Sequence, residues 1–188
     1  MAIPDNVTLK PADASQARAL FEPICKLYDI VFSQPPFNWT DDRSAAHRND
    51  LERLVANPSF GATTAHVGTE LVGFGYGVSL RPDTRWWQGA VEPLAADLTV
   101  ERPGRTFAVI DFGVHRAYRR QGIGRALLEM LLATREEERA TLAVRPTATA
   151  AQEFYRRLGW WKVGRVAGAP GEPAPFFDLY VLPLKTTP

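Results

Sequence analysis

The stretch that most constrains the fold runs from Thr106 to Leu128, TFAVIDFGVHRAYRRQGIGRALL. Its first part, through Val114, is an apolar run typical of a buried strand. A basic loop with two glycines, Arg119 to Gly124, follows and leads directly into a segment with apolar residues at helical spacing. The first N–H groups of a helix lack intrahelical partners, and the helix dipole places partial positive charge there. The stretch therefore predicts a strand, a loop and a helix whose beginning binds phosphate.

The composition of this loop fits the same ligand. Gly122 and Gly124 have no Cβ, so a ligand can approach the backbone closely, and Arg119, Arg120 and Arg125 offer charge-assisted hydrogen bonds. We therefore expect a small polyphosphate rather than a nucleic-acid duplex.

Two better-known nucleotide loops do not match. A Walker A loop requires Lys followed by Ser or Thr after its last glycine, and here Arg125 and Ala126 stand there. A dinucleotide fingerprint has three glycines and follows the first strand of a βαβ unit, whereas this loop has two of the three and follows a predicted hairpin. The loop is thus a phosphate site of another kind.

The composition predicts a single domain over residues 1–188, since 188 residues with 45% hydrophobic side chains suffice for one sizeable core. A net charge of +1 argues against a general nucleic-acid binder. The first residues lack the pattern of a signal peptide, and no apolar run reaches the length of a membrane span. With Cys25 as its one cysteine, the chain is expected to be cytoplasmic and without a membrane partner.

Periodicity and turn residues predict the remaining elements. In chain order they are a strand at Val7 to Lys10, one helix over Ala17 to Val31 kinked at Pro23, a second helix from Thr40 or Asp41 to before Pro58, a hairpin of Phe60 to Val67 with Leu71 to Leu80, an insertion or lid at Arg81 to Gly104 with a short helix, the central strand and helix, a strand at Ala140 to Val144, a helix beginning near Thr149, and a hairpin of Trp160 to Val166 with Phe176 to Leu182. The central strand, its helix and the following strand form a βαβ unit with a parallel pair.

Two features of the sequence each allow more than one interpretation. Gly73, Gly75 and Gly77 leave one strand face without side chains, which favours either a helix packed on it or a bound ligand. Trp86 and Trp87 in the insertion are suited to the wall of a substrate site, to a dimer contact or to ordinary core packing.

Two motifs in this order of elements resemble the GCN5-related N-acetyltransferase (GNAT) superfamily. They are Arg119-x-x-Gly122-x-Gly124 after a strand that ends at Val114, and Phe154-Tyr155-x-x-x-Gly159-Trp160 further along. The resemblance extends over nearly the whole chain. It implies an α/β fold with a mixed, mostly antiparallel central sheet, a splayed parallel pair, and helices on both faces. It also implies acetyl-CoA as co-substrate, no metal, a small-molecule or peptide amine as acceptor, and a possible homodimer.

The resemblance implies a role for each matched residue. Tyr155 is expected to protonate the departing CoA thiolate, although a core tyrosine would show the same pattern. The N–H of Val114 is expected to polarise the thioester carbonyl. The residues expected to bind the cofactor are Phe112, Gly113 and Val114 at the pantetheine, and Arg119, Arg120, Gln121, Gly122, Ile123, Gly124 and Arg125 at the pyrophosphate.

The acceptor side is less defined. Asp111 resembles the second acid of an acidic pair near the acceptor amine, but Ile110 replaces the first. Asp111 is therefore expected to act through water, to act as an electrostatic partner of the amine, or to form a structural ion pair with an arginine. Ala148 likewise replaces an asparagine that contacts pantetheine in many family members.

The expected activity is transfer of an acetyl group to a primary amine by direct attack. The alternative is a catalytically silent acyl-CoA-binding sensor of the same fold. The sequence does not select among polyamine, aminoglycoside, amino acid and protein N-terminus as acceptor, nor between acetyl and larger acyl groups. Metal ligation is not expected, because the histidines His47, His66 and His115 are scattered.

Overall fold

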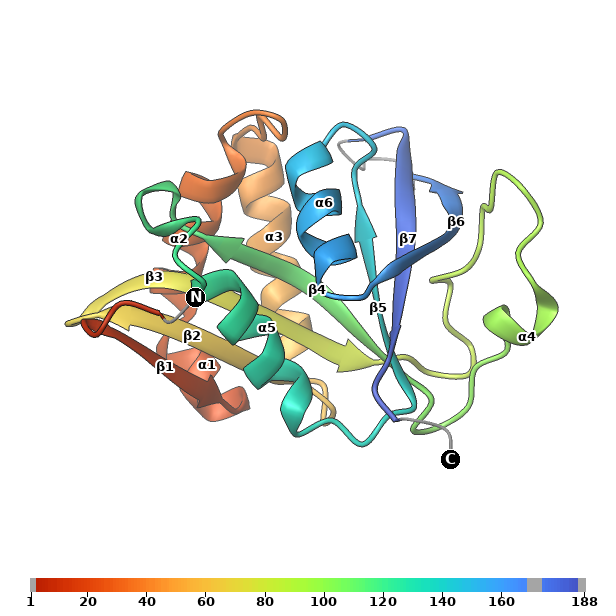
Figure 1. The fold of residues 1–188 in the computed structure, drawn as a ribbon, viewed down its shortest axis with the longest axis horizontal. Helices are drawn as coiled ribbons and strands as arrows, with labels where there is room; N and C mark the ends of the chain where they lie inside the picture. The colour runs from red at the N-terminus through yellow and green to blue at the C-terminus, as the bar shows by residue number, and fades with distance from the viewer. Residues whose placement is uncertain (1–2, 169–173, 186–188) are drawn as a thin grey trace. The chain divides into compact units, whose positions relative to one another are not determined.

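Seven strands form a mixed sheet in the computed structural model, which describes residues 3–168 and 174–185 (Figure 1). The strands are β1 (Val7–Ala12), β2 (Gly61–Val67), β3 (Glu70–Ser79), β4 (Thr106–Val114), β5 (Arg139–Val144), β6 (Trp161–Ala167) and β7 (Phe176–Pro183). Their order in the sheet is β1-β2-β3-β4-β5-β7-β6, mostly antiparallel with one parallel pair, β4 and β5. The predicted α/β class with such a sheet is confirmed.

The helices complete the elements of the described residues. They are α1 (Ala14–Ala19), α2 (Phe21–Phe32), α3 (Asp41–Val55), α4 (Ala96–Thr99), α5 (Ile123–Ala133) and α6 (Thr149–Arg157), with a 3-10 turn at Arg116–Tyr118. The chain divides into two compact units, the first made of Met1–Val78 with Val109–Arg135 and the second of Ser79–Ala108 with Glu136–Pro188. Within residues 3–168 and 174–185, no helix has both the length and the apolar character needed to cross a membrane.

The first unit has helices on both faces of strands β1 to β3. On one face, the helices α1 to α3 bury Ile24, Tyr28 and Leu51 against Phe74 of β3. On the other face, α5 buries Leu127 against smaller apolar residues of the strands, and Figure 1 shows this helix lying across β1 and β2. Helices on both faces were predicted, and the alternation of apolar residues along the strands is the reason for both layers.

Helix α5 also explains the bare face of β3. A Cβ placed on Gly73 would lie 2.8 Å from Cδ1 of Leu127, and one on Gly75 would lie 2.6 Å from Cδ2 of Phe112. Both distances are shorter than side chains tolerate. The groups packed against these two glycines are therefore Leu127 of α5 and Phe112 of β4. This favours the interpretation of a packed helix over that of a bound ligand.

The predicted single helix over Ala17 to Val31 is wrong in one respect, because the structure has two helices that meet at Leu20. Asp13 and Gln16 form a reciprocal capping box that begins α1. Pro23 lies in the first turn of α2, where the missing N–H leaves no intrahelical hydrogen bond unmade. Pro23 therefore lies at the beginning of a second helix and does not kink a continuous one.

The second unit is built on β5, β7 and β6, with the beginning of β4 at the parallel pairing. That pairing joins Thr106 to Arg139 and Ala108 to Thr141. The insertion contains the short helix α4, as predicted, and it also pairs with β6. Ala90 forms an antiparallel bridge with Val166, supported by Val91 N to Arg165 O at 2.9 Å and Ala167 N to Gly89 O at 2.8 Å.

Candidate functional site

The beginning of α5 has the geometry of an anion site. Its N-cap is Gly122 with φ 79°, in the left-handed region that glycine adopts without strain. Among the described residues, no side chain caps this end of the helix. The first N–H groups of an eleven-residue helix are therefore left without a side-chain acceptor. An anionic group such as a pyrophosphate fits this donor set.

The side chains of the loop have different roles. The Nε of Arg119 donates to the carbonyl of Val114 at 2.8 Å, and burial together with the charge of Arg116 lowers the pKa of its guanidinium. Arg119 therefore ties the loop back to the end of β4. Arg125 forms an exposed ion pair with Glu129 at 2.7 Å. Arg120 is exposed, with φ 62°.

Two further loop residues hold the loop in place. The side-chain amide of Gln121 donates to the carbonyl of Ala117 at 3.1 Å. Ile123, the first residue of α5, is buried in a cluster with Val7, Ala65 and Val72 of the strands, so packing fixes the beginning of the helix. The backbone that would meet a phosphate is thus held from both sides.

The end of β4 presents backbone groups away from β3. The N–H of His115 donates to the carbonyl of Val72 in β3 at 2.9 Å. Successive amides of an extended strand point to opposite edges, so the N–H groups of Val114 and Phe112 point to the other edge of β4. A Cβ on Gly113, between them, would lie 3.2 Å from Cγ1 of Val31. Phe112, Gly113 and Val114 thus form a strand segment whose edge away from β3 can hydrogen-bond another extended group.

Asp111 ends a buried chain of hydrogen bonds that was not predicted. The hydroxyl of Tyr76 donates to Oδ2 of Asp111 at 2.5 Å, and Nε2 of His47 lies 2.8 Å from the same hydroxyl. We call His47, Tyr76 and Asp111 the Asp111 chain. Ile110 packs on the apolar cluster that contains Tyr76, so two consecutive residues of β4 contact one face of the sheet, as in a β-bulge.

One sequence signal for His47 existed. His47, Leu51 and Val55 follow each other at steps of four residues, and all three are buried on one stripe of α3. A polar residue on an apolar stripe requires a partner. Tyr76 carried no comparable signal, because a tyrosine in an alternating strand is typical of a core.

The surroundings of His47 keep its ring neutral. The side chain is 1% exposed, and Tyr28 stacks on it with ring centroids 3.4 Å apart. Burial, followed by the positive charges of Arg43 and Arg48, lowers the pKa of His47 from 6.5 to about 3. Burial, followed by the charge of Asp111, raises the pKa of Tyr76 well above its usual value.

Tyr155 lies in α6, buried among aromatic rings. Phe154 and Trp160 meet it edge to face, with centroids 5.1 Å and 5.9 Å away. Ala148, at the N-cap of α6, makes no side-chain cap, and the side chain of Gln152 instead donates to the carbonyl of Pro146 at 2.9 Å. This burial fits the core alternative for Tyr155, and its role as an acid stays a prediction.

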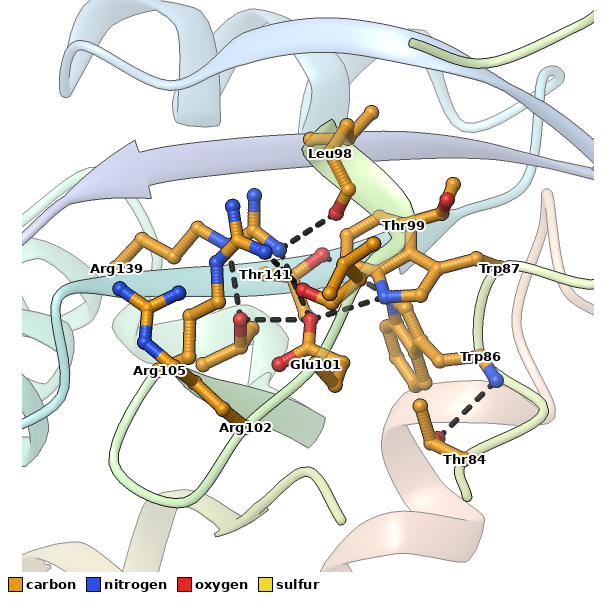
Figure 2. Close-up of polar contacts among 12 residues, drawn as sticks. Thr84, Trp86, Trp87, Leu98, Thr99, Glu101, Arg102, Arg105, Arg139 and Thr141 are labelled. Atoms are coloured by element: carbon orange, nitrogen blue, oxygen red, sulfur yellow. Dashed lines mark hydrogen bonds and ion pairs between the residues drawn. The ribbon is translucent and has the colours of Figure 1, made fainter. Parts of the chain in front are cut away.

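Trp86 and Trp87 anchor the insertion within the second unit (Figure 2). The Nε1 of Trp87 donates to Oε1 of Glu101 at 3.0 Å, and the same oxygen accepts from Nη2 of Arg139 at 2.9 Å and from Oγ1 of Thr106 at 2.9 Å. We call Glu101, Arg139, Trp87 and Thr106 the Glu101 cluster.

The Nε1 of Trp86 donates a hydrogen bond to Oγ1 of Thr141 at 3.1 Å. Trp86 thus bonds directly to β5, while Trp87 is connected to β4 and β5 through Glu101. These contacts favour core packing among the three interpretations of the tryptophan pair.

No group of three or more His, Cys, Asp or Glu side chains within residues 3–168 and 174–185 comes together in a way that could hold a metal ion.

A strand that leads through a basic loop into a helix without a side-chain cap at its beginning is an arrangement suited to phosphate. A family model described as "Acetyltransferase (GNAT) family" matches residues 24–160, more than half of the chain and parts of both compact units. The chain belongs to this family, and it is an N-acetyltransferase whose acetyl donor is acetyl-CoA.

Solved structures share the fold. A GNAT-family protein from Desulfovibrio desulfuricans is 13% identical with a TM-score of 0.65, covering 95% of this chain and 99% of its own. The ribosomal-protein-S18-alanine N-acetyltransferase of Escherichia coli is 15% identical with a TM-score of 0.61, covering 97% and 96%. An aminoglycoside 6'-N-acetyltransferase complexed with coenzyme A is 18% identical with a TM-score of 0.63, covering 96% and 99%. No curated protein matched the chain.

Proposed function

We propose that this N-acetyltransferase moves the acetyl group of acetyl-CoA to a primary amine of a small molecule or a peptide, by direct attack of the neutral amine on the thioester. The observation that carries the proposal is the uncapped beginning of α5, with Gly122 in the left-handed region directly after the basic loop. There the backbone N–H groups of Gln121 to Arg125 would bind the pyrophosphate, and Phe112 to Val114 would bond to the pantetheine amides.

The acetyl-CoA site is tested by thermal unfolding. Ligand at 100 times its Kd stabilises a protein by about 2.7 kcal/mol, which raises the midpoint by several degrees. Gly122→Glu places a side chain and a negative charge at the anion site, so the shift should disappear. Gly68→Glu is the matched control, because Gly68 also has a left-handed φ of 57° but lies in the turn between β2 and β3. No shift with the wild-type protein at millimolar acetyl-CoA contradicts the proposal.

The chemistry is assigned to two groups. The N–H of Val114 polarises the thioester carbonyl, and an oxyanion donor contributes about 10²- to 10³-fold to kcat. Val114→Pro should therefore lower kcat by about this factor while Val114→Ala retains it. Circular dichroism of both variants establishes that they fold.

Tyr155 protonates the departing thiolate, a general-acid role that contributes about 10²- to 10⁴-fold. Tyr155→Phe should lower kcat accordingly, whereas Tyr180→Phe, which removes the hydroxyl of another buried tyrosine, should not. Equal rates for Tyr155→Phe and wild type across pH would contradict the acid role and leave Tyr155 as a core residue.

The acceptor is identified by measuring CoA release with spermidine, kanamycin, lysine and a peptide that begins with alanine. The panel includes an aminoglycoside and an N-terminal alanine because two structurally similar enzymes carry those acceptors in their names. Acetyl-CoA binding without CoA release for any amine would favour the silent sensor. The single domain, the cytoplasmic location and the homodimer stay predictions.

A further inference from the structure

The peptide group between Val114 and His115 is held on both sides. Its N–H donates to the carbonyl of Val72 in β3 at 2.9 Å, and its carbonyl accepts from Nε of Arg119 at 2.8 Å. The N–H and the carbonyl of a trans peptide point in opposite directions, so Nε of Arg119 lies at the edge of β4 away from β3. A residue of an extended strand directs its own N–H and carbonyl to one edge, and the N–H of Val114 therefore points to this same edge.

The backbone of Arg119 is fixed by the turn that follows β4. The N–H of Tyr118 donates to the carbonyl of His115 at 2.9 Å, and the N–H of Arg119 donates to the carbonyl of Arg116 at 3.3 Å. Tyr118 also packs on the apolar cluster that contains Ile123, the first residue of α5. The side chain of Arg119 thus runs from an ordered turn back to the end of the strand. It couples the loop that would hold the pyrophosphate to the backbone that would face the thioester.

The side chain of Arg119 has two properties that can be separated. Its guanidinium carries a positive charge and has several N–H groups that can meet an anion. The hydrogen of Nε, by contrast, is directed at a carbonyl of the protein itself. A role in binding phosphate depends on the charge, whereas a role in holding the end of β4 depends on the Nε donor.

We propose that Arg119 is a positioning residue for acetyl transfer, whose Nε bond to the carbonyl of Val114 sets the direction of the Val114 N–H toward the thioester carbonyl. The inference rests on the proposed function and extends it, because the sequence placed Arg119 only at the pyrophosphate. An oxyanion donor is effective only within a narrow range of distance and direction. A loosened strand end therefore lowers turnover at saturating substrate more than it weakens binding of the cofactor.

Two substitutions of Arg119 remove its charge and differ in the hydrogen bond. The amide nitrogen of glutamine lies as many bonds from Cα as Nε of arginine does, and so does the terminal methyl of methionine. Arg119→Gln therefore retains a donor for the carbonyl of Val114, and Arg119→Met does not. An effect common to both variants belongs to the charge, and a difference between them belongs to the bond. Arg116→Met is the control, because Arg116 is an exposed arginine of the same turn.

The bond is tested first in the ligand-free protein, by amide hydrogen exchange. Without the Nε donor, the peptide after Val114 is held from β3 alone. Loss of one hydrogen bond should speed exchange of the His115 N–H about tenfold in Arg119→Met and by less than about threefold in Arg119→Gln and Arg116→Met. Equal exchange rates in Arg119→Gln and Arg119→Met overturn the proposal.

The role in turnover is tested with acetyl-CoA and the best amine of the spermidine, kanamycin, lysine and peptide panel. At saturating substrates, kcat should fall about tenfold in Arg119→Met, part of the 10²- to 10³-fold that an oxyanion donor contributes, and by less than about threefold in Arg119→Gln. The Kd of acetyl-CoA, measured by calorimetry, should change by the same factor in both variants, because both lack the charge. Equal kcat values, or variants that differ only in Kd, overturn the positioning role.

Failure of this role and failure of the proposed function give different results. If no amine releases CoA, the proposed function fails and a role of Arg119 in acetyl transfer fails with it. If the wild-type protein acetylates an amine and Arg119→Gln and Arg119→Met have equal kcat values, the proposed function stands and the positioning role alone is wrong.

Discussion

Two carboxylates, the buried Glu101 of the second unit and the partly buried Asp111 of the first, have different surroundings. Glu101 receives the guanidinium of Arg139 as well as Trp87 and Thr106 on one oxygen, and its side chain is 0% exposed. Oδ2 of Asp111 accepts from the hydroxyl of Tyr76, which His47 contacts in turn, and the Asp111 side chain is 17% exposed. Removing Glu101 therefore leaves a buried cation unpaired, whereas removing the hydroxyl of Tyr76 takes one hydrogen bond from Asp111.

The largest predicted effect is on the Glu101 cluster. Glu101→Ala leaves the charge of Arg139 buried and unpaired, and leaves the donors of Trp87 and Thr106 without their acceptor. We expect a loss of about 3 to 5 kcal/mol in the free energy of unfolding, measured by urea titration. A loss below about 1 kcal/mol would mean that the two carboxylates are not held differently.

The second effect is on the Asp111 chain. Tyr76→Phe removes the hydroxyl that lies between His47 and Asp111, so one buried donor and one acceptor lose their partner. We expect about 1 to 3 kcal/mol of destabilisation, less than for Glu101→Ala because no cation is left uncompensated. Urea titrations of the two variants under one set of conditions give the order, and the reverse order contradicts the comparison.

The third effect is a dependence on pH. His47 has a pKa of about 3 in the folded protein and 6.5 as a free side chain, so between these values the unfolded chain binds the additional proton. Its contribution to stability is therefore complete above pH 6.5 and is lost as pH falls toward 3, by at most about 1.4 kcal/mol per pH unit.

Unfolding by urea between about pH 6 and pH 5 measures this loss as the difference between wild type and His47→Gln. A slope that persists in His47→Gln would assign the effect to other groups.

The smallest effect is on an exposed pair of the same unit as Glu101. Arg102 and Glu138 form an ion pair with side chains 57% and 46% exposed. Arg102→Ala should cost less than about 1 kcal/mol, and the difference should shrink in high salt. Compared with the loss of stability in Glu101→Ala, the loss in Arg102→Ala shows how much an ion pair contributes when it is not buried.

The fold was largely predictable from the sequence, because its signals are local. Apolar periodicity marked every strand, and Gly122 marked the beginning of α5. The boundary at Leu20 was missed because the apolar stripe runs on through it, and Pro23 suggested a kink where it begins a helix. The capping box of Asp13 and Gln16 marks the beginning of a helix at Ala14 but does not mark its end before Leu20.

The candidate site was predictable only where its expected binding groups are backbone groups of one continuous stretch. Phe112 to Val114 and the basic loop follow from one continuous stretch. The Asp111 chain joins α3, β3 and β4, whose side chains meet only after folding, so no spacing in the sequence relates His47 to Tyr76. The same holds for Trp87, which donates to Glu101 of the insertion and lies under the guanidinium of Arg139 from β5.

The bridge between Ala90 and Val166 has a consequence for association. Strand β6 is the last strand of the sheet order, and a free edge is a template on which another chain can add a strand. Part of the insertion, around Gly89 to Val91, occupies this edge at Arg165 to Ala167. The insertion thus protects the protein against edge-to-edge aggregation, and any assembly through this end of β6 would first have to displace it.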